Sequence, residues 1–120
     1  MALSQHLPIY KLARDLTGLA VSLTRNMPRD LKRTLGDRVL DQCFDMSLLI
    51  FRANVAQGTD RLGHIQQLLE RNQVTELTLR LCVDHRLIST KQYANAIEIT
   101  DQIGKQATGW KKQTAAAPVA

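Results

Sequence analysis

The segment from Pro28 to Ala56 constrains the fold more than any other part of this chain, because it is typical of one long helix with two apolar stripes. In both stripes, apolar residues recur every three or four positions, the spacing of one face of an α-helix. The first stripe consists of Leu31, Leu35, Val39, Cys43, Met46, Ile50 and Ala53. The second consists of Leu40, Phe44, Leu48, Phe51 and Val55. A surface helix of a small bundle needs only one such stripe, so the second predicts contact with another subunit.

The rest of the chain shows the same helical periodicity. Its pattern and breaks predict four helices, over residues 8–24, 29–57, 59–86 and 90–112. We expect Gly58 to end the second helix as its C-cap, and Ser89 with Gln92 to form a capping box for the fourth. Short connections between long helices predict an all-α, up-down-up-down four-helix bundle over residues 8–112. Residues 1–7 are expected to be a flexible N-terminus, and residues 113–120 a disordered tail.

Composition also favours a small helical domain. The 120 residues are enough for one domain with its own core, and only 4% of them are aromatic, so aliphatic side chains carry the packing. Cys43 and Cys82 lie in apolar stretches without a C-x-x-C motif, which predicts buried, reduced thiols and a cytoplasmic protein. No apolar stretch approaches the roughly 18 residues of a membrane span. We therefore expect neither a secretion signal nor a membrane partner.

The chain lacks the residue combinations of well-known catalytic and metal sites. Di-iron bundles need E-x-x-H pairs on facing helices, but neither Glu70, Glu76 nor Glu98 is followed by a histidine at the required position. No H-x-x-x-H zinc pair and no C-x-x-C-H haem motif is present. A thiol nucleophile beside His85 is the remaining enzymatic alternative, and buried structural cysteines explain the same residues more simply. We expect no enzymatic activity, no metal and no cofactor.

A basic cluster is the best lead to function. The whole chain has a formal net charge of +5, which is compatible with binding to nucleic acid or to an acidic protein. Five cations fall within fourteen residues and outnumber the two acidic residues there, Asp30 and Asp37. They are Arg25, Arg29, Lys32, Arg33 and Arg38, and we name them the basic cluster. Such a cluster predicts salt-sensitive binding of phosphates. The alternative is a self-paired helix face, with Arg33–Asp37 and Arg38–Asp41 ion pairs.

The segment LRLCVDHRLISTKQYANAI offers a third interpretation, a helix-turn-helix that reads DNA. In that motif the residues at the start of the second helix contact base edges. Lys91, Gln92 and Asn95 occupy this position here. The flanking helices are several turns longer than a typical recognition unit, which disfavours this alternative.

Three parts of the chain resemble a known family. The first is the apolar seam of the first helix, formed by Ile9, Leu12, Leu16, Leu19 and Leu23. The others are the start of the second helix (MPRDLKRTLGDRVLD) and the closing segment LRLCVDHRLISTKQYANAIEITDQIGKQATGWKK with its Gly109-Trp110 pair. Together, from about Tyr10 to Lys112, they resemble the Avd (accessory variability determinant) proteins of diversity-generating retroelements. Those proteins are related to the small four-helix proteins encoded in intervening sequences of bacterial 23S ribosomal RNA genes.

The resemblance implies both an assembly and a role. It implies a barrel-like homopentamer whose basic surface binds RNA and possibly DNA, and it places that surface regionally at the basic cluster. It also implies a partnership with the retroelement's reverse transcriptase, which copies a template RNA with errors at adenines. The expected function is a non-catalytic accessory factor of mutagenic retrohoming. A four-helix structural or protein-interaction module without a nucleic-acid role is the main alternative.

Overall fold

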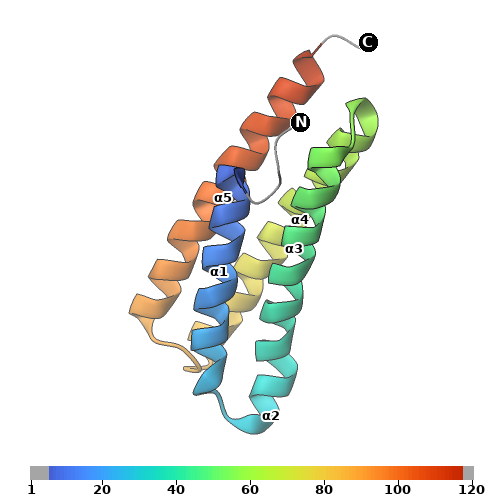
Figure 1. The fold of residues 1–120 in the computed structure, drawn as a ribbon. Coiled ribbons are helices and arrows are strands. Elements are labelled where there is room, and N and C mark those ends of the chain that lie inside the picture. Colours follow the sequence, from blue (N-terminus) through green and yellow to red (C-terminus); the bar gives the residue numbers. More distant parts are fainter. Residues whose placement is uncertain (1–5, 118–120) are drawn as a thin grey trace.

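The computed structural model describes residues 6–117, and these residues form four long helices in up-down-up-down order (Figure 1). The helices pack as an elongated bundle with extents of 52 × 21 × 19 Å. The described elements are α1 (Pro8–Arg25), α2 (Arg29–Leu31), the π-helical segment η2 (Lys32–Gly36), α3 (Asp37–Val55), α4 (Gly58–Asp84) and α5 (Thr90–Ala116). The predicted all-α four-helix bundle is therefore confirmed.

The bundle core contains most of the first apolar stripe. Val39, Cys43, Met46, Ile50 and Ala53 of α3 are all at most 1% exposed. They pack with apolar residues that recur at helical spacing along the other helices: Ile9, Leu16 and Leu23 of α1, Ile65, Leu68 and Leu79 of α4, and Ala96, Ile103 and Ala107 of α5. Removing this continuous apolar surface from water is the main stabilising contribution to the fold.

The start of the second helix differs from the prediction. The helix from Arg29 to Val55 is continuous, but its residues Lys32–Gly36 are π-helical, and the Asp37 amide donates to the carbonyl of Lys32, five residues earlier. A π segment breaks the 3.6-residue period, so residues before it no longer share the face of those after it. Leu31 is consequently 39% exposed instead of buried with the first stripe. Gly36 lies against α1, where an added Cβ would come 3.2 Å from Thr24 Cγ2 and 3.3 Å from Met27 Sδ.

The connection between α3 and α4 corrects a second expectation. Gly58 is not the C-cap of the preceding helix, which ends at Val55; it is the first residue of α4 and has φ +58°. Arg61 satisfies carbonyls at the end of α3 instead, because its guanidinium donates to Ala53 O at 2.8 Å and to Asn54 O at 3.1 Å. The same guanidinium lies 5.8 Å from the ring centroid of Trp110. It thereby links α3, α4 and α5 at this end of the bundle.

The chain ends also differ from the prediction where they are described. Residues 113–116 were expected in a disordered tail, but α5 continues through them to Ala116. Alanine has the highest helix propensity, and the Thr114 hydroxyl donates to Trp110 O at 2.8 Å, within the same helix. Residues 118–120 and 1–5 lie outside the described residues. Of the predicted flexible N-terminus, Leu7 is half-buried against the core.

Polar contacts fix the pairing of α4 with α5. The predicted capping box is present at the start of α5, since Gln92 N donates to Ser89 Oγ and Ser89 N donates to Gln92 Oε1.

Two hydrogen bonds join α4 to α5: Asn72 Nδ2 donates to Thr100 O at 2.9 Å, and the Thr100 hydroxyl donates to Glu76 Oε2 at 2.8 Å. Because buried polar groups need their partners, these bonds oppose a slip of one helix along the other.

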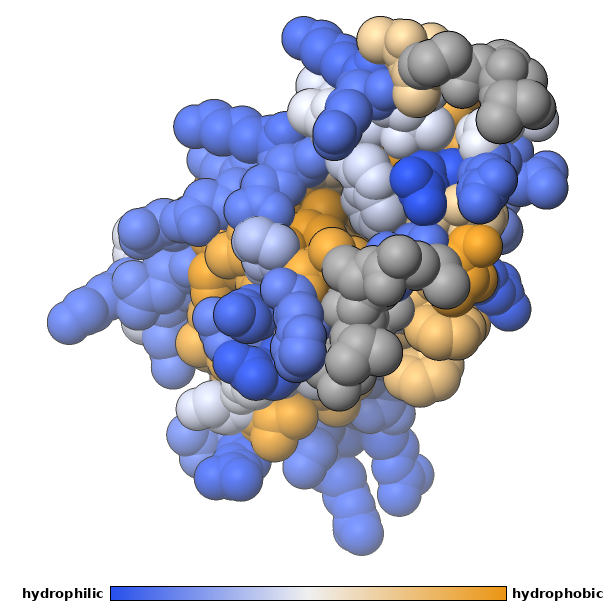
Figure 2. All heavy atoms as spheres, turned by 45° about the horizontal axis from the view of Figure 1, so that its top comes forward, coloured by the Kyte–Doolittle hydropathy of each residue, from blue (hydrophilic) through white to orange (hydrophobic). Residues whose placement is uncertain are grey.

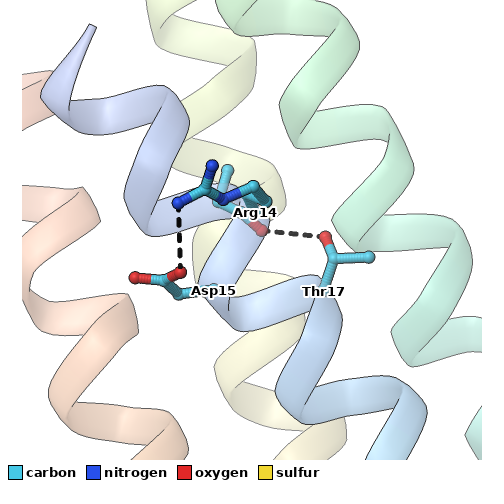
Figure 3. Close-up of polar contacts among 4 residues, drawn as sticks. Arg14, Asp15 and Thr17 are labelled. Carbon is cyan, nitrogen blue, oxygen red and sulfur yellow. Dashed lines mark hydrogen bonds and ion pairs between the residues drawn. The ribbon is translucent and has the colours of Figure 1, made fainter. Parts of the chain in front are cut away.

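Both cysteines are buried and free, as predicted. Burial raises the pKa of the Cys43 thiol from 9.0 to about 11, although a hydrogen bond with Thr17 acts in the opposite direction. Burial also raises the pKa of Cys82. Figure 3 shows Thr17 on α1 pointing towards α3, with its hydroxyl donating to Ala13 O of its own helix and the Arg14–Asp15 pair on another side of α1.

The Cys43 thiol predicts a loss of stability at alkaline pH. Its pKa is higher in the folded than in the unfolded chain, so its contribution to stability is complete below about pH 9 and is lost as the pH rises towards 11. A difference of two pKa units corresponds to roughly 3 kcal/mol. We expect urea denaturation to show a fall in the free energy of unfolding over this range that is smaller in Cys43→Ala. An identical fall in both proteins would contradict the assignment.

None of the helices between residues 6 and 117 is long and apolar enough to span a lipid bilayer.

Candidate nucleic-acid interface

The topology brings two connections together at one end of the bundle. Because the helices alternate in direction, the α1–α2 connection and the α4–α5 turn lie at the same end, the lower end in Figure 1. We call this end the basic end. Opposite it lies the α3–α4 connection, beyond which α5 extends.

The structure places the whole basic cluster at or near the basic end. Arg25 is the last residue of α1, and Arg29 is the first residue of α2. Lys32 and Arg33 belong to η2, and Arg38 lies in the first turn of α3. All five side chains are exposed, so the sequence cluster is also a spatial cluster that faces solvent.

These cations are not neutralised by ion pairs of their own. Within residues 6–117 the ion pairs are Arg14–Asp15 at 3.9 Å and Arg80–Asp84 at 3.2 Å, and neither includes a member of the basic cluster. The Arg33–Asp37 pair of the self-paired alternative does not form: Arg33 lies within η2, whose π-helical geometry changes the spacing that would bring the two side chains together. The basic cluster therefore keeps its positive charge available for a partner.

The sequence interpretation did not connect two further cations with this end: it considered Lys91 only as a DNA-contacting residue, and Arg86 was not assigned to the basic cluster. Arg86 lies in the turn after α4, and Lys91 lies in the first turn of α5; both are exposed. In the sequence they lie 48 and 53 positions after Arg38, the last member of the basic cluster. The predicted up-down order of the helices could have located them, because it places residues 84–91 at the same end of the bundle as residues 25–38.

The helix-turn-helix alternative finds a less suitable geometry. The Gln92 side chain is held in the capping box, where its Oε1 accepts the Ser89 amide, while Lys91 and Asn95 are exposed. The two helices, α4 and α5, have 27 residues each and run side by side in opposite directions (Figure 1). A DNA-reading unit instead crosses two helices at about 90–120°.

The second apolar stripe lies largely on the surface. Phe44 is 67% exposed and Phe51 51% exposed, and Val55 is exposed as well, whereas Leu40 and Leu48 are half-buried. Figure 2 shows apolar side chains at the surface on its right-hand side, the side on which α3 and α4 lie in Figure 1. Three exposed residues of α4, Val74, Leu77 and Leu81, recur at steps of three and four and make a further apolar row. Contiguous exposed apolar surface is where protein–protein contacts can form, so these rows are candidate contact surfaces.

The described residues hold no group of three or more His, Cys, Asp or Glu side chains placed to bind a metal ion.

Comparison with known proteins adds information on the fold. No protein-family model matches the chain, and no curated protein matches its sequence. Among solved structures, the chain is similar to a protein of unknown function from the S23 ribosomal protein family of Bacteroides thetaiotaomicron. That likeness has a TM-score of 0.78 and 19% sequence identity, and it covers 87% of this chain and 95% of the other. It shows a shared four-helix fold, in partial agreement with the resemblance found in the sequence.

Proposed function

We propose that this protein is a non-catalytic, oligomeric accessory factor of a diversity-generating retroelement, binding both nucleic acid and the element's reverse transcriptase. The observation that carries the proposal is the basic end, where the exposed basic cluster forms no ion pair with any other residue between positions 6 and 117. The resemblance to Avd proteins supplies the retroelement context. The fold shared with a protein of the S23 family is compatible with that context.

Phosphate binding follows from the charge and exposure of this end. An unpaired arginine offers up to five N–H donors in a planar fork that matches phosphate oxygens, whereas an arginine already paired with aspartate has lost that capacity. Binding to phosphate releases counterions from the nucleic acid, so the affinity falls as salt increases. In a homopentamer the total formal charge would reach roughly +25, which would strengthen the attraction of RNA at low salt.

The exposed apolar rows support the oligomer and the protein partner. One protomer leaves Phe44, Phe51 and Val55 on α3 and Leu77 on α4 exposed to water, and a second protomer or a partner protein would cover such residues. We assign the second apolar stripe, the α3 row, to contact between protomers. It lies on the same helix whose first stripe forms the core of each protomer. The α4 row is then available to the reverse transcriptase.

Charge reversal at the basic end tests the nucleic-acid role. The triple variant Arg29→Glu, Lys32→Glu and Arg33→Glu should bind a single-stranded RNA at least about 100-fold more weakly in 50 mM salt, because each lost phosphate contact removes one counterion-release contribution. The plot of log affinity against log salt should also become less steep. Fluorescence anisotropy of a labelled RNA across a salt series measures both quantities.

A matched triple variant on α5 controls for net charge. Lys105→Glu, Lys111→Glu and Lys112→Glu changes the total charge by the same amount in the half of α5 away from the basic end, and it should reduce affinity much less. Equal losses in the two triples would show that only total charge matters. If the wild-type protein fails to bind RNA at low salt, the nucleic-acid role is overturned and the protein-interaction module becomes the better account, since the apolar rows favour a protein partner in either case.

The genomic neighbourhood tests the retroelement context independently. An adjacent reverse-transcriptase gene, together with two near-identical repeats that differ at adenines, is the expected arrangement. Their absence would contradict the retroelement role without affecting the RNA-binding result.

A further inference from the structure

The turn after α4 holds an arginine in a conformation that favours glycine. Arg86 has φ +58°. Its amide donates to Val83 O at 3.0 Å, and the Leu87 amide donates to Cys82 O at 2.9 Å. These two hydrogen bonds make a complete Schellman motif, which closes a helix with a left-handed residue that is usually glycine.

A non-glycine residue is unfavourable there for a steric reason. The left-handed conformation brings Cβ too close to the following carbonyl oxygen, and glycine alone avoids this contact. The other described residue with φ near +58°, Gly58, follows that preference. The Arg86 side chain is exposed and makes no hydrogen bond or ion pair with any residue in the described part of the chain. Within residues 6–117, the Arg86 side chain therefore adds no hydrogen bond or ion pair that would offset the cost of this backbone conformation.

Lys91 is a second cation in a position that local helix physics disfavours. It is the second residue of α5, whose first turn contains no acidic residue. The amino-terminal end of a helix carries a partial positive charge and favours anions. Two cations at the same turn are thus placed where the stability of the turn alone would favour other residues.

We propose that Arg86 and Lys91 form the second half of the nucleic-acid interface and contact phosphates of the strand that the basic cluster binds. This inference rests on the proposed function and extends the interface from one connection to both. The strand would cross the end of the bundle, whose cross-section measures 21 × 19 Å. The free energy of these phosphate contacts would offset the cost of the left-handed backbone at Arg86 and of a cation at the start of α5.

Arg86→Gly and Arg86→Gln separate the two consequences of the arginine. Arg86→Gly relieves the strained backbone, so its thermal midpoint should rise by roughly 4 °C. Both variants should bind a labelled twelve-nucleotide RNA about fivefold more weakly or worse, and the salt slope should fall by about 0.7 for each lost phosphate contact. Arg52→Gln is the matched control, because Arg52 is an exposed arginine in the last turn of α3, at the opposite end of the bundle.

The outcomes discriminate clearly. Greater stability combined with weaker RNA binding in Arg86→Gly, and a smaller loss in Arg52→Gln, support the inference. Equal losses in Arg86→Gln and Arg52→Gln overturn it, because total charge alone would explain them. If the charge reversal of the basic cluster abolishes binding while both Arg86 variants bind normally, the interface is limited to the first connection, and the proposed function stands without this extension.

Discussion

Replacing Ile50 with alanine is expected to lower the free energy of unfolding by about 3 kcal/mol, within the range of 2–5 kcal/mol found for buried isoleucine. Ile50 belongs to the first apolar stripe and is fully buried, with one of the largest buried side chains of the core. Truncation removes its transfer free energy and leaves a cavity, because the four close-packed helices relax only partly. Urea denaturation followed by far-UV circular dichroism measures the change.

The adjacent residue provides the control. Phe51 has the larger side chain but is 51% exposed, so Phe51→Ala should change the stability of the protomer much less than Ile50→Ala. Any loss that it does cause should depend on protein concentration, since we assign Phe51 to contact between protomers. If the two variants destabilised the protein equally and independently of concentration, the separation of the two stripes into core and surface would be wrong.

Two lysines in the exposed stripe should dissociate the proposed oligomer. In Phe44→Lys with Phe51→Lys, two charges replace the apolar side chains that a neighbouring subunit would desolvate, and burying them without partners is strongly unfavourable. The expected result is a change from an oligomer to a species near the 13.5 kDa of one chain. Light scattering coupled to size-exclusion chromatography measures the mass, and circular dichroism should show that the helices remain.

The matched control adds the same charge elsewhere. Gln102→Lys with Gln106→Lys places two lysines on exposed positions of α5 and should leave the oligomer intact. If the wild-type protein has the mass of a single chain, the assignment of the α3 stripe to contact between protomers is overturned. A wild-type oligomer that survives the Phe44 and Phe51 substitutions would instead place the contact elsewhere, with the α4 row as the next surface to test.

The sequence pattern predicted the features that depend on regular helical spacing. Ile50 and Phe51 are neighbours in the chain, yet the two-stripe pattern assigned one to the core and the other to the outside, and their burial agrees. The Ser89–Gln92 capping box was likewise readable, because it depends on two residues three positions apart. The regular pattern did not predict η2. Gly36, the last residue of η2, packs closely against Thr24 and Met27, and such a tertiary contact is not visible in helical spacing.

The candidate interface was predictable in part for a similar reason. The basic cluster is compact in the sequence and could be recognised there. Arg86 and Lys91 lie near it only because of the topology of the bundle. The positive φ of Arg86 could not be predicted from the sequence, because arginine rarely adopts this backbone conformation. The extension of α5 to Ala116 was missed because an alanine run has no amphipathic pattern, although its helix propensity is high.

The π segment η2 has one further consequence. It directly precedes the core-forming part of α3, contains the cations Lys32 and Arg33, and separates Arg29 from the packed region. One residue corresponds to about 100° of rotation around an α-helix. Inserting or deleting a single residue in η2 would therefore turn Arg29, at the start of the helix, to a different direction, while the packed region of α3 keeps its position.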